Sequence, residues 1–226
     1  MSSTRNLIAG LALATVSSLA WSGLIPTYDS FGSLPQATFG GTGIPNHAVA
    51  YSSIGNVTIG LTAHQRYVGP NLSNDGAGTF DADPGEGLNP GYSTWNVGYY
   101  VSSTSMLLGP FYRMLYDFTE FGEIIPSFSG QFNMGSLSLW PPRQDSHNLG
   151  ENWLLGWGNL PFDPEAEGTY GFALVAYSDS RYRNEVGRVA INVRVGEPEA
   201  VPEPGALALA GLSLGLLGLA RRRRLH

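Results

Sequence analysis

The sequence predicts an all-β fold: an antiparallel, jelly-roll-like β-sandwich flanked by an apolar segment at each terminus. Three observations predict it. The 226 residues include 30 Gly and 15 Pro and few charges, a composition that suits short strands joined by many turns. Apolar residues alternate with a period of two in five stretches. No segment between the termini shows a helical period longer than two turns.

The five alternating stretches are predicted to be half-buried strands, because side chains two residues apart lie on the same face of a strand. Clusters of Gly, Pro, Asn and Asp separate them. Residues 24–45 are rich in Gly and Pro and are expected to run over the surface before the first long strand. We expect one domain over residues 21–196. The inward-facing residues are predicted to be Val57, Ile59, Leu61 and Ala63; Trp95, Val97, Tyr99 and Val101; Tyr112, Met114, Tyr116 and Phe118; Tyr170, Phe172, Leu174 and Ala176; and Val189, Ile191, Val193 and Val195.

Composition and charge exclude several classes of function. Cysteine is absent, which rules out disulfides, thiol catalysis and Cys-ligated metal sites. All twelve basic residues are Arg. Only seven of them lie between Trp21 and Val201, against seventeen Asp and Glu, a net charge of −10. Such an acidic body is not suited to bind the backbone of a nucleic acid, and we expect no cofactor.

Residues 1–20 have the order of a secretory signal peptide. Arg5 supplies the positive charge, the stretch LIAGLALA the apolar core, and residues 18–20 a small-x-small cleavage site. Cleavage after Ser22 fits nearly as well. No further charge appears before residue 29, so an amphipathic helix of the folded body would lack its polar face. The protein is therefore expected to be exported.

The C-terminus has three parts in order. Residues 197–204 form a Pro-rich tether, residues 205–220 carry no charge, and residues 221–226 are basic. Sixteen apolar residues make a helix of about 24 Å, which is short for a single span of a hydrocarbon core about 30 Å thick. Basic residues stay on the cytoplasmic side, so the body is expected to lie across the membrane. A buried core helix would not need four consecutive Arg. The tether ends in Pro202, Glu203 and Pro204, and the basic cluster is Arg221, Arg222, Arg223 and Arg224.

Pro-Glu-Pro, a span rich in Gly, Ala and Leu, and a terminal Arg cluster together resemble the PEP-CTERM sorting domain of Gram-negative bacteria. This resemblance covers roughly 25 residues. It implies recognition by exosortase, a membrane processing enzyme, after a transient stage in the inner membrane. It also implies a final place at the cell surface or in the extracellular matrix, in a setting of exopolysaccharide and biofilm. The tracts TFGGTGIPN (38–46), GLTAHQRY (60–67) and FDPEAEGTYGFALVAYS (162–178) resemble a recurring class of PEP-CTERM proteins without an assigned activity.

Two acidic stretches are the clearest polar clusters of the body. Oxygen ligands at short spacing in Gly-rich loops are what Ca²⁺ requires, so Asp81, Asp83 and Glu86 are weak calcium candidates. The spacing of an EF-hand loop is absent and Pro84 interrupts the stretch, which favours a solvated loop that holds no metal. The first stretch contains Asp75, Asp81, Asp83 and Glu86, and the second contains Asp163, Glu165 and Glu167.

The remaining candidates are His and Trp residues. His47, His64 and His147 stand apart in the sequence and form no metal-binding or catalytic spacing, and His64 is expected to be a half-buried residue beside a strand. Trp140, Trp153 and Trp157 could stack on sugar rings, but filling the core is the more common role of Trp in an all-β body.

These observations predict an exported, non-enzymatic protein of the cell surface or matrix, sorted by its C-terminal tail. A carbohydrate-binding module for the cell's own exopolysaccharide is the alternative. A secreted glycosidase that uses two of the acidic residues comes third.

Overall fold

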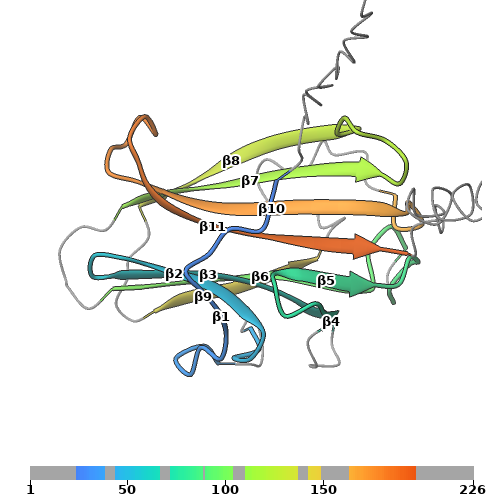
Figure 1. The fold of residues 1–226 in the computed structure, drawn as a ribbon, viewed down its shortest axis with the longest axis horizontal. Coiled ribbons are helices and arrows are strands. Elements are labelled where there is room, and N and C mark those ends of the chain that lie inside the picture. Colours follow the sequence, from blue (N-terminus) through green and yellow to red (C-terminus); the bar gives the residue numbers. More distant parts are fainter. Residues whose placement is uncertain are drawn as a thin grey trace, which may run out of the picture.

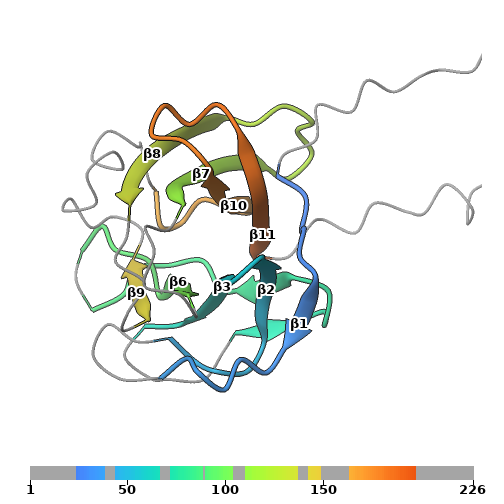
Figure 2. The same ribbon diagram turned by 90° about the vertical axis from the view of Figure 1, so that its left-hand side faces the viewer.

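The protein is a two-layer β-sandwich (Figures 1 and 2). The computed structural model describes residues 24–38, 44–66, 72–88, 90–103, 110–136, 142–148 and 163–196. In the view of Figure 2, β8, β7, β10 and β11 lie above β9, β6, β3 and β2. The first sheet has the order β1 (Ser30–Gly32), β2 (Val49–Ile54), β3 (Val57–Gln65), β6 (Trp95–Ser103) and β9 (Arg143–Asn148). The second has the order β4 (Ser73–Asn74), β5 (Thr79–Ala82), β11 (Glu185–Val195), β10 (Gly168–Tyr177), β7 (Phe111–Glu120) and β8 (Phe128–Ser136).

The five predicted strands are confirmed as β3, β6, β7, β10 and β11, the long strands of the sandwich. Their predicted inward-facing residues form one buried core between the sheets, apart from Tyr99, which is half-buried against it. Trp95 of the first sheet crosses to the second, where its ring lies edge-on to Tyr170 at 5.5 Å and to Phe172 at 6.2 Å between centroids. The apolar positions of the alternating pattern are therefore the buried core positions, because each strand buries one face against the opposite sheet.

The all-β class is confirmed, but two details of the predicted class are wrong. β5 runs parallel to β11 with Asn192 beside Thr79 and Val195 beside Ala82, so the second sheet is mixed. Over the described residues the two sheets hold five and six strands, whereas a jelly roll has eight strands in all. The parallel pair arises because the chain leaves β3 in the first sheet and reaches the second as the short β4–β5 hairpin.

Both predicted terminal helices, of the signal peptide and of the tail, lie outside the described residues. Within the ranges given above, no helix has the length and hydropathy that a membrane span requires.

Residues 24–45 were expected to wander over the surface, and this is wrong for the described part of the segment. It contributes β1 and buries Leu34, Ala37 and Ile44 against the outer face of the first sheet, where they pack with Val49 and Tyr100. These side chains can pack closely on the outer face of β3 and β6 because the outward-facing positions of both strands include glycine. A Cβ at Gly98 would collide with Ile44. Covering both faces of a sheet hides more apolar surface than the period of two alone predicts.

We expect Gly98→Ala to destabilise the protein by about 1–3 kcal/mol, because the added methyl displaces Ile44 from a packed site. Gly60→Ala on the neighbouring strand is the control, since its Cβ would meet Val49 Cγ1 at a milder 3.1 Å. Urea unfolding measures both. Equal free energies of unfolding for the two variants would contradict the packing of Ile44 on this face.

The two ends of the sandwich differ, and the register of the second sheet defines them. Val195, at the end of β11, lies beside Gly168 of β10 and Ala82 of β5, and Gly168 lies beside Glu120 of β7. We call this the tail-proximal end, because the chain leaves it at Gly196 (Figure 1, right). The tail-distal end carries the β10–β11 loop, residues 178–184, and the first residues of β11.

Candidate functional site

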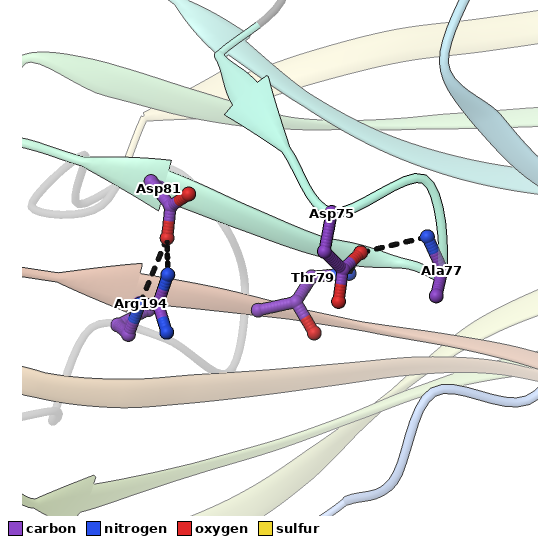
Figure 3. Close-up of polar contacts among 5 residues, drawn as sticks. All are labelled: Asp75, Ala77, Thr79, Asp81 and Arg194. Carbon is purple, nitrogen blue, oxygen red and sulfur yellow. Dashed lines mark hydrogen bonds and ion pairs between the residues drawn. The ribbon is translucent and has the colours of Figure 1, made fainter.

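The first acidic stretch is used for local structure (Figure 3). Arg194 of β11 donates from Nε to Asp81 Oδ1 at 2.8 Å, and its Nη2 contacts the same oxygen. Asp75 Oδ1 accepts from the backbone N–H of Ala77 at 2.7 Å and of Thr79 at 3.0 Å, which shapes the turn between β4 and β5. Partial burial opposes ionisation, but these N–H groups hold the pKa of Asp75 below its ordinary value.

The side chains of the other two calcium candidates, Asp83 and Glu86, have different surroundings. Glu86 Oε1 accepts from the N–H of Gly91 at 3.0 Å and closes a turn, whereas the Asp83 side chain is exposed. In the second stretch, Asp163 Oδ1 accepts from the N–H of Glu165 at 2.9 Å just before β10. Over the ranges that the structure describes, no three His, Asp or Glu side chains come together as a metal site. The ion pair with Arg194 gives Asp81 a positive partner within the protein itself.

We therefore expect a chelator to leave the melting temperature unchanged. Asp81 is held by Arg194, and Asp75 and Glu86 are held by backbone N–H groups, none of which chelation removes. Thermal unfolding with and without EDTA measures this, and Asp83→Asn should behave like the wild type. A loss of several degrees on chelation would contradict it and would restore Asp81, Asp83 and Glu86 as metal ligands.

The three His residues lie on different elements of the fold. His47 is exposed in a bend before β2. His64 is buried at the end of β3 with its Nδ1 3.0 Å from the carbonyl oxygen of Gln65, and burial lowers its pKa despite that hydrogen bond. The expectation of a half-buried residue beside the strand is therefore wrong in both details, because His64 belongs to β3 and is buried. His147 lies on β9, at the edge of the first sheet.

Sequence analysis missed a small cluster around His147. Its ring stacks on Tyr99 of β6 at 5.8 Å between centroids, and its Nε2 lies 3.8 Å from Asp145 Oδ2. Burial, with a smaller contribution from the Asp145 charge, raises the pKa of Tyr99 to about 12. Ser146, the serine between the two, lies on the opposite face of β9, with its Oγ near Asn96. The cluster therefore brings a His and an Asp together without that serine. It was missed because β9 is a polar strand with no apolar period.

Asp117 is the second residue that sequence analysis missed. It points from β7 onto the outer face of the second sheet and is only 8% exposed, because residues at the start of the described chain cover it. Its Oδ2 accepts from the Leu24 N–H at 2.6 Å, and Gly171 leaves the space that its other oxygen fills. Burial raises the pKa of Asp117, and the N–H groups of Leu24 and Gly171 offset only part of that effect.

The raised pKa of Asp117 predicts a pH dependence of stability. The folded state binds a proton more readily than the unfolded state, so stability should rise as pH falls from neutral towards the ordinary pKa of Asp. Asp117→Asn should remove this contribution. The free energy of unfolding of the variant, relative to that of the wild type, should therefore be highest at neutral pH. Asp179→Asn is an opposite-sign control, because N–H bonds, led by that of Asn184, lower the pKa of Asp179. Urea unfolding at neutral and acidic pH measures both, and parallel pH profiles would contradict the assignment.

The remaining predicted site residues lie outside the described residues. These are Trp140, Trp153 and Trp157, the Pro202-Glu203-Pro204 motif and the Arg221 to Arg224 cluster. Their roles stay predictions as far as the structure is concerned.

Comparison with known proteins identifies the tail. Among curated proteins none matches the chain. Among protein families, the PEP-CTERM protein-sorting motif matches residues 200–224, which include the Pro-Glu-Pro sequence and all four terminal Arg. Such a motif implies export, sorting to the cell surface and processing by an exosortase-type membrane enzyme. The chain thus carries a PEP-CTERM protein-sorting motif, which begins four residues after Gly196, the last described residue of its β-sandwich.

Proposed function

We propose that the β-sandwich is a non-catalytic domain of the cell surface or extracellular matrix of a Gram-negative bacterium, delivered by its tail in an exopolysaccharide setting. The observation that carries the proposal is the sorting motif at residues 200–224, directly after the body. The engagement of Asp75, Asp81 and Glu86 in turns and an ion pair supports the non-catalytic part.

Delivery proceeds in two steps. Residues 1–20 direct export, and residues 205–220 then halt in the inner membrane as a single span with the body outside. The four Arg hold the end of the tail in the cytoplasm, because carrying each through hydrocarbon costs at least about 2.5 kcal/mol. An exosortase-type enzyme then cuts near Pro202-Glu203-Pro204 and releases the body or passes it on.

Intact-mass analysis of protein recovered from the cell surface and the medium tests this proposal. We expect a mature form that starts after the signal peptide, near Trp21 or Gly23, and that lacks Leu225 and His226. Protein that still begins at Met1 would contradict export. Surface protein that retains Leu225 and His226 would contradict processing and leave an ordinary single-span anchor.

A carbohydrate-binding role is the second candidate, and one cluster on the outer face of the second sheet favours it. The Arg113 guanidinium lies 4.5 Å from the ring centroid of Tyr182 and 5.4 Å from that of Tyr177. It donates to Asn133 Oδ1 at 2.8 Å and Gln131 Oε1 at 3.2 Å. Aromatic faces beside amide and guanidinium groups are the chemistry that sugar rings and hydroxyls require.

Affinity electrophoresis through the exopolysaccharide of the producing cells tests the second candidate. Arg113→Ala and Tyr182→Ala should lose the retardation that the wild type shows. Arg188→Ala is the control, since Arg188 pairs with Glu185 on the same sheet. Equal mobility of the wild type with and without polysaccharide would exclude this role for that polymer.

A further inference from the structure

The tail-proximal end exposes large apolar side chains. Ile124 and Ile125, in the loop between β7 and β8, are 75% and 59% exposed, and Leu88, in the turn after β5, is 85% exposed. Large apolar side chains this exposed at one end of a domain are candidates for a contact with another molecule or with lipid. The other two exposed large apolar residues of the described chain, Ile25 and Val186, lie elsewhere, and Val186 is at the tail-distal end.

The structure fixes these residues at that end. The loop of Ile124 and Ile125 leaves β7 at Glu120 and is closed by hydrogen bonds from Glu123 N–H to the Glu120 carbonyl at 3.1 Å and from Ser127 N–H to the Phe118 carbonyl at 2.7 Å. The turn of Leu88 is closed by a hydrogen bond from Gly87 N–H to the Tyr92 carbonyl at 2.7 Å. Both loops lie at the end of the sandwich where β11 ends (Figure 1, right): the Leu88 turn follows β5, which pairs with β11, and the Ile124 loop follows β7, which is separated from β11 by β10.

The distance to the bilayer is short. Gly205, the first residue of the apolar span, follows Gly196 by nine residues, which reach at most about 32 Å when fully extended. While the tail is inserted, the tail-proximal end cannot move further than this from the membrane surface. A tether of this length keeps the tail-proximal end at a high effective concentration next to the membrane surface. Contacts with lipid that would be too weak for a free domain can therefore be populated.

We propose that Ile124, Ile125 and Leu88 rest on the lipid surface while the tail is inserted, and so set the body upright with its tail-distal end outward. This inference rests on the proposed membrane insertion of the tail. Two isoleucines and a leucine at loop tips can enter the headgroup region, where apolar side chains gain by leaving water.

The charges of this end limit how deep the contact goes. Seven exposed carboxylates surround the apolar tips, and anionic lipid repels them. The contact is therefore shallow, made with zwitterionic headgroups, and weakened by a high content of anionic lipid at low salt. The carboxylates are those of Asp83, Glu86, Glu120, Glu123, Asp163, Glu165 and Glu167.

The absence of cysteine permits a direct test. The full-length protein with its tail is placed in nanodiscs of phosphatidylethanolamine and phosphatidylglycerol that contain lipids nitroxide-labelled near the headgroup. A fluorophore is attached to a single cysteine introduced as Ile124→Cys, Leu88→Cys or, as the matched control at the other end, Val186→Cys. We expect strong quenching at 124 and 88 and little at 186. Ile124→Asp combined with Ile125→Asp should abolish the quenching at 88.

Three results would overturn the inference. Equal quenching at 124 and 186 in protein that stays in the nanodiscs would show that the body has no preferred orientation, and would leave the proposed tail insertion intact. Loss of the protein from the nanodiscs would overturn both proposals. If the Asp variants slow processing in cells but quenching at 124 is absent without the enzyme, the surface binds the processing enzyme instead of lipid.

Discussion

Replacing Pro202-Glu203-Pro204 with three alanines is expected to leave the full-length protein in the inner membrane and to abolish the processed form. The substitution removes the Pro-Glu-Pro part of the matched motif. It leaves the sixteen apolar residues and the four terminal Arg unchanged, so the terms that determine insertion are preserved. Membrane fractionation followed by intact-mass analysis measures the result, and the expected change is from mostly processed to almost wholly unprocessed protein.

Two further variants make this prediction specific. Glu197→Ala removes the same charge as Glu203→Ala but lies before the matched residues, so it should be processed normally. Deleting Arg221 to Arg224 should let the tail slip through the membrane and appear uncut outside the cell. Normal processing of the triple-alanine protein would contradict a role for Pro-Glu-Pro in recognition.

Trp95→Ala is expected to cost about 3–5 kcal/mol of unfolding free energy, a large part of the roughly 5–15 kcal/mol that holds such a domain together. Trp95 is 2% exposed and joins the sheets, with its ring edge-on to Tyr170 and Phe172. Removing the indole leaves a cavity between the two sheets and deletes both aromatic contacts.

Urea unfolding measures the loss, and Trp95→Phe is the matched control. Phe keeps an aromatic ring opposite Tyr170 and should recover much of the lost stability. A loss below about 1 kcal/mol for Trp95→Ala would contradict the placement of this side chain between the sheets.

The sequence predicts the long strands well and the short or polar strands poorly. β3, β6, β7, β10 and β11 bury one face against the opposite sheet, so their apolar residues alternate. β2 begins with Val49 buried on the outer face and Ala50 buried in the central core, and this two-sided burial removes the alternation. β9, with the sequence RQDSHN, pairs along its length with β6 but contains no apolar residue.

The candidate sites divide in the same way. The sorting motif is local in the sequence and is found from its order alone. Asp117 looks like an ordinary outward-facing residue of an alternating strand. Its burial depends on Leu24, which lies 93 residues away, and only the folded chain brings the two together. The same holds for His147 and Tyr99, which meet because β9 pairs with β6.

The position of β11 has a mechanical consequence for the stage at which the membrane enzyme binds and cuts the tail. β11 is an interior strand, paired with β10 along most of its length and with β5 at its last four residues, and the tail continues from its end. A pull on the tail along the strand axis therefore loads the hydrogen bonds to both neighbours in shear, so that many must break together and not one after another. The sandwich is thus built to stay folded while its tail is held, turned or cut.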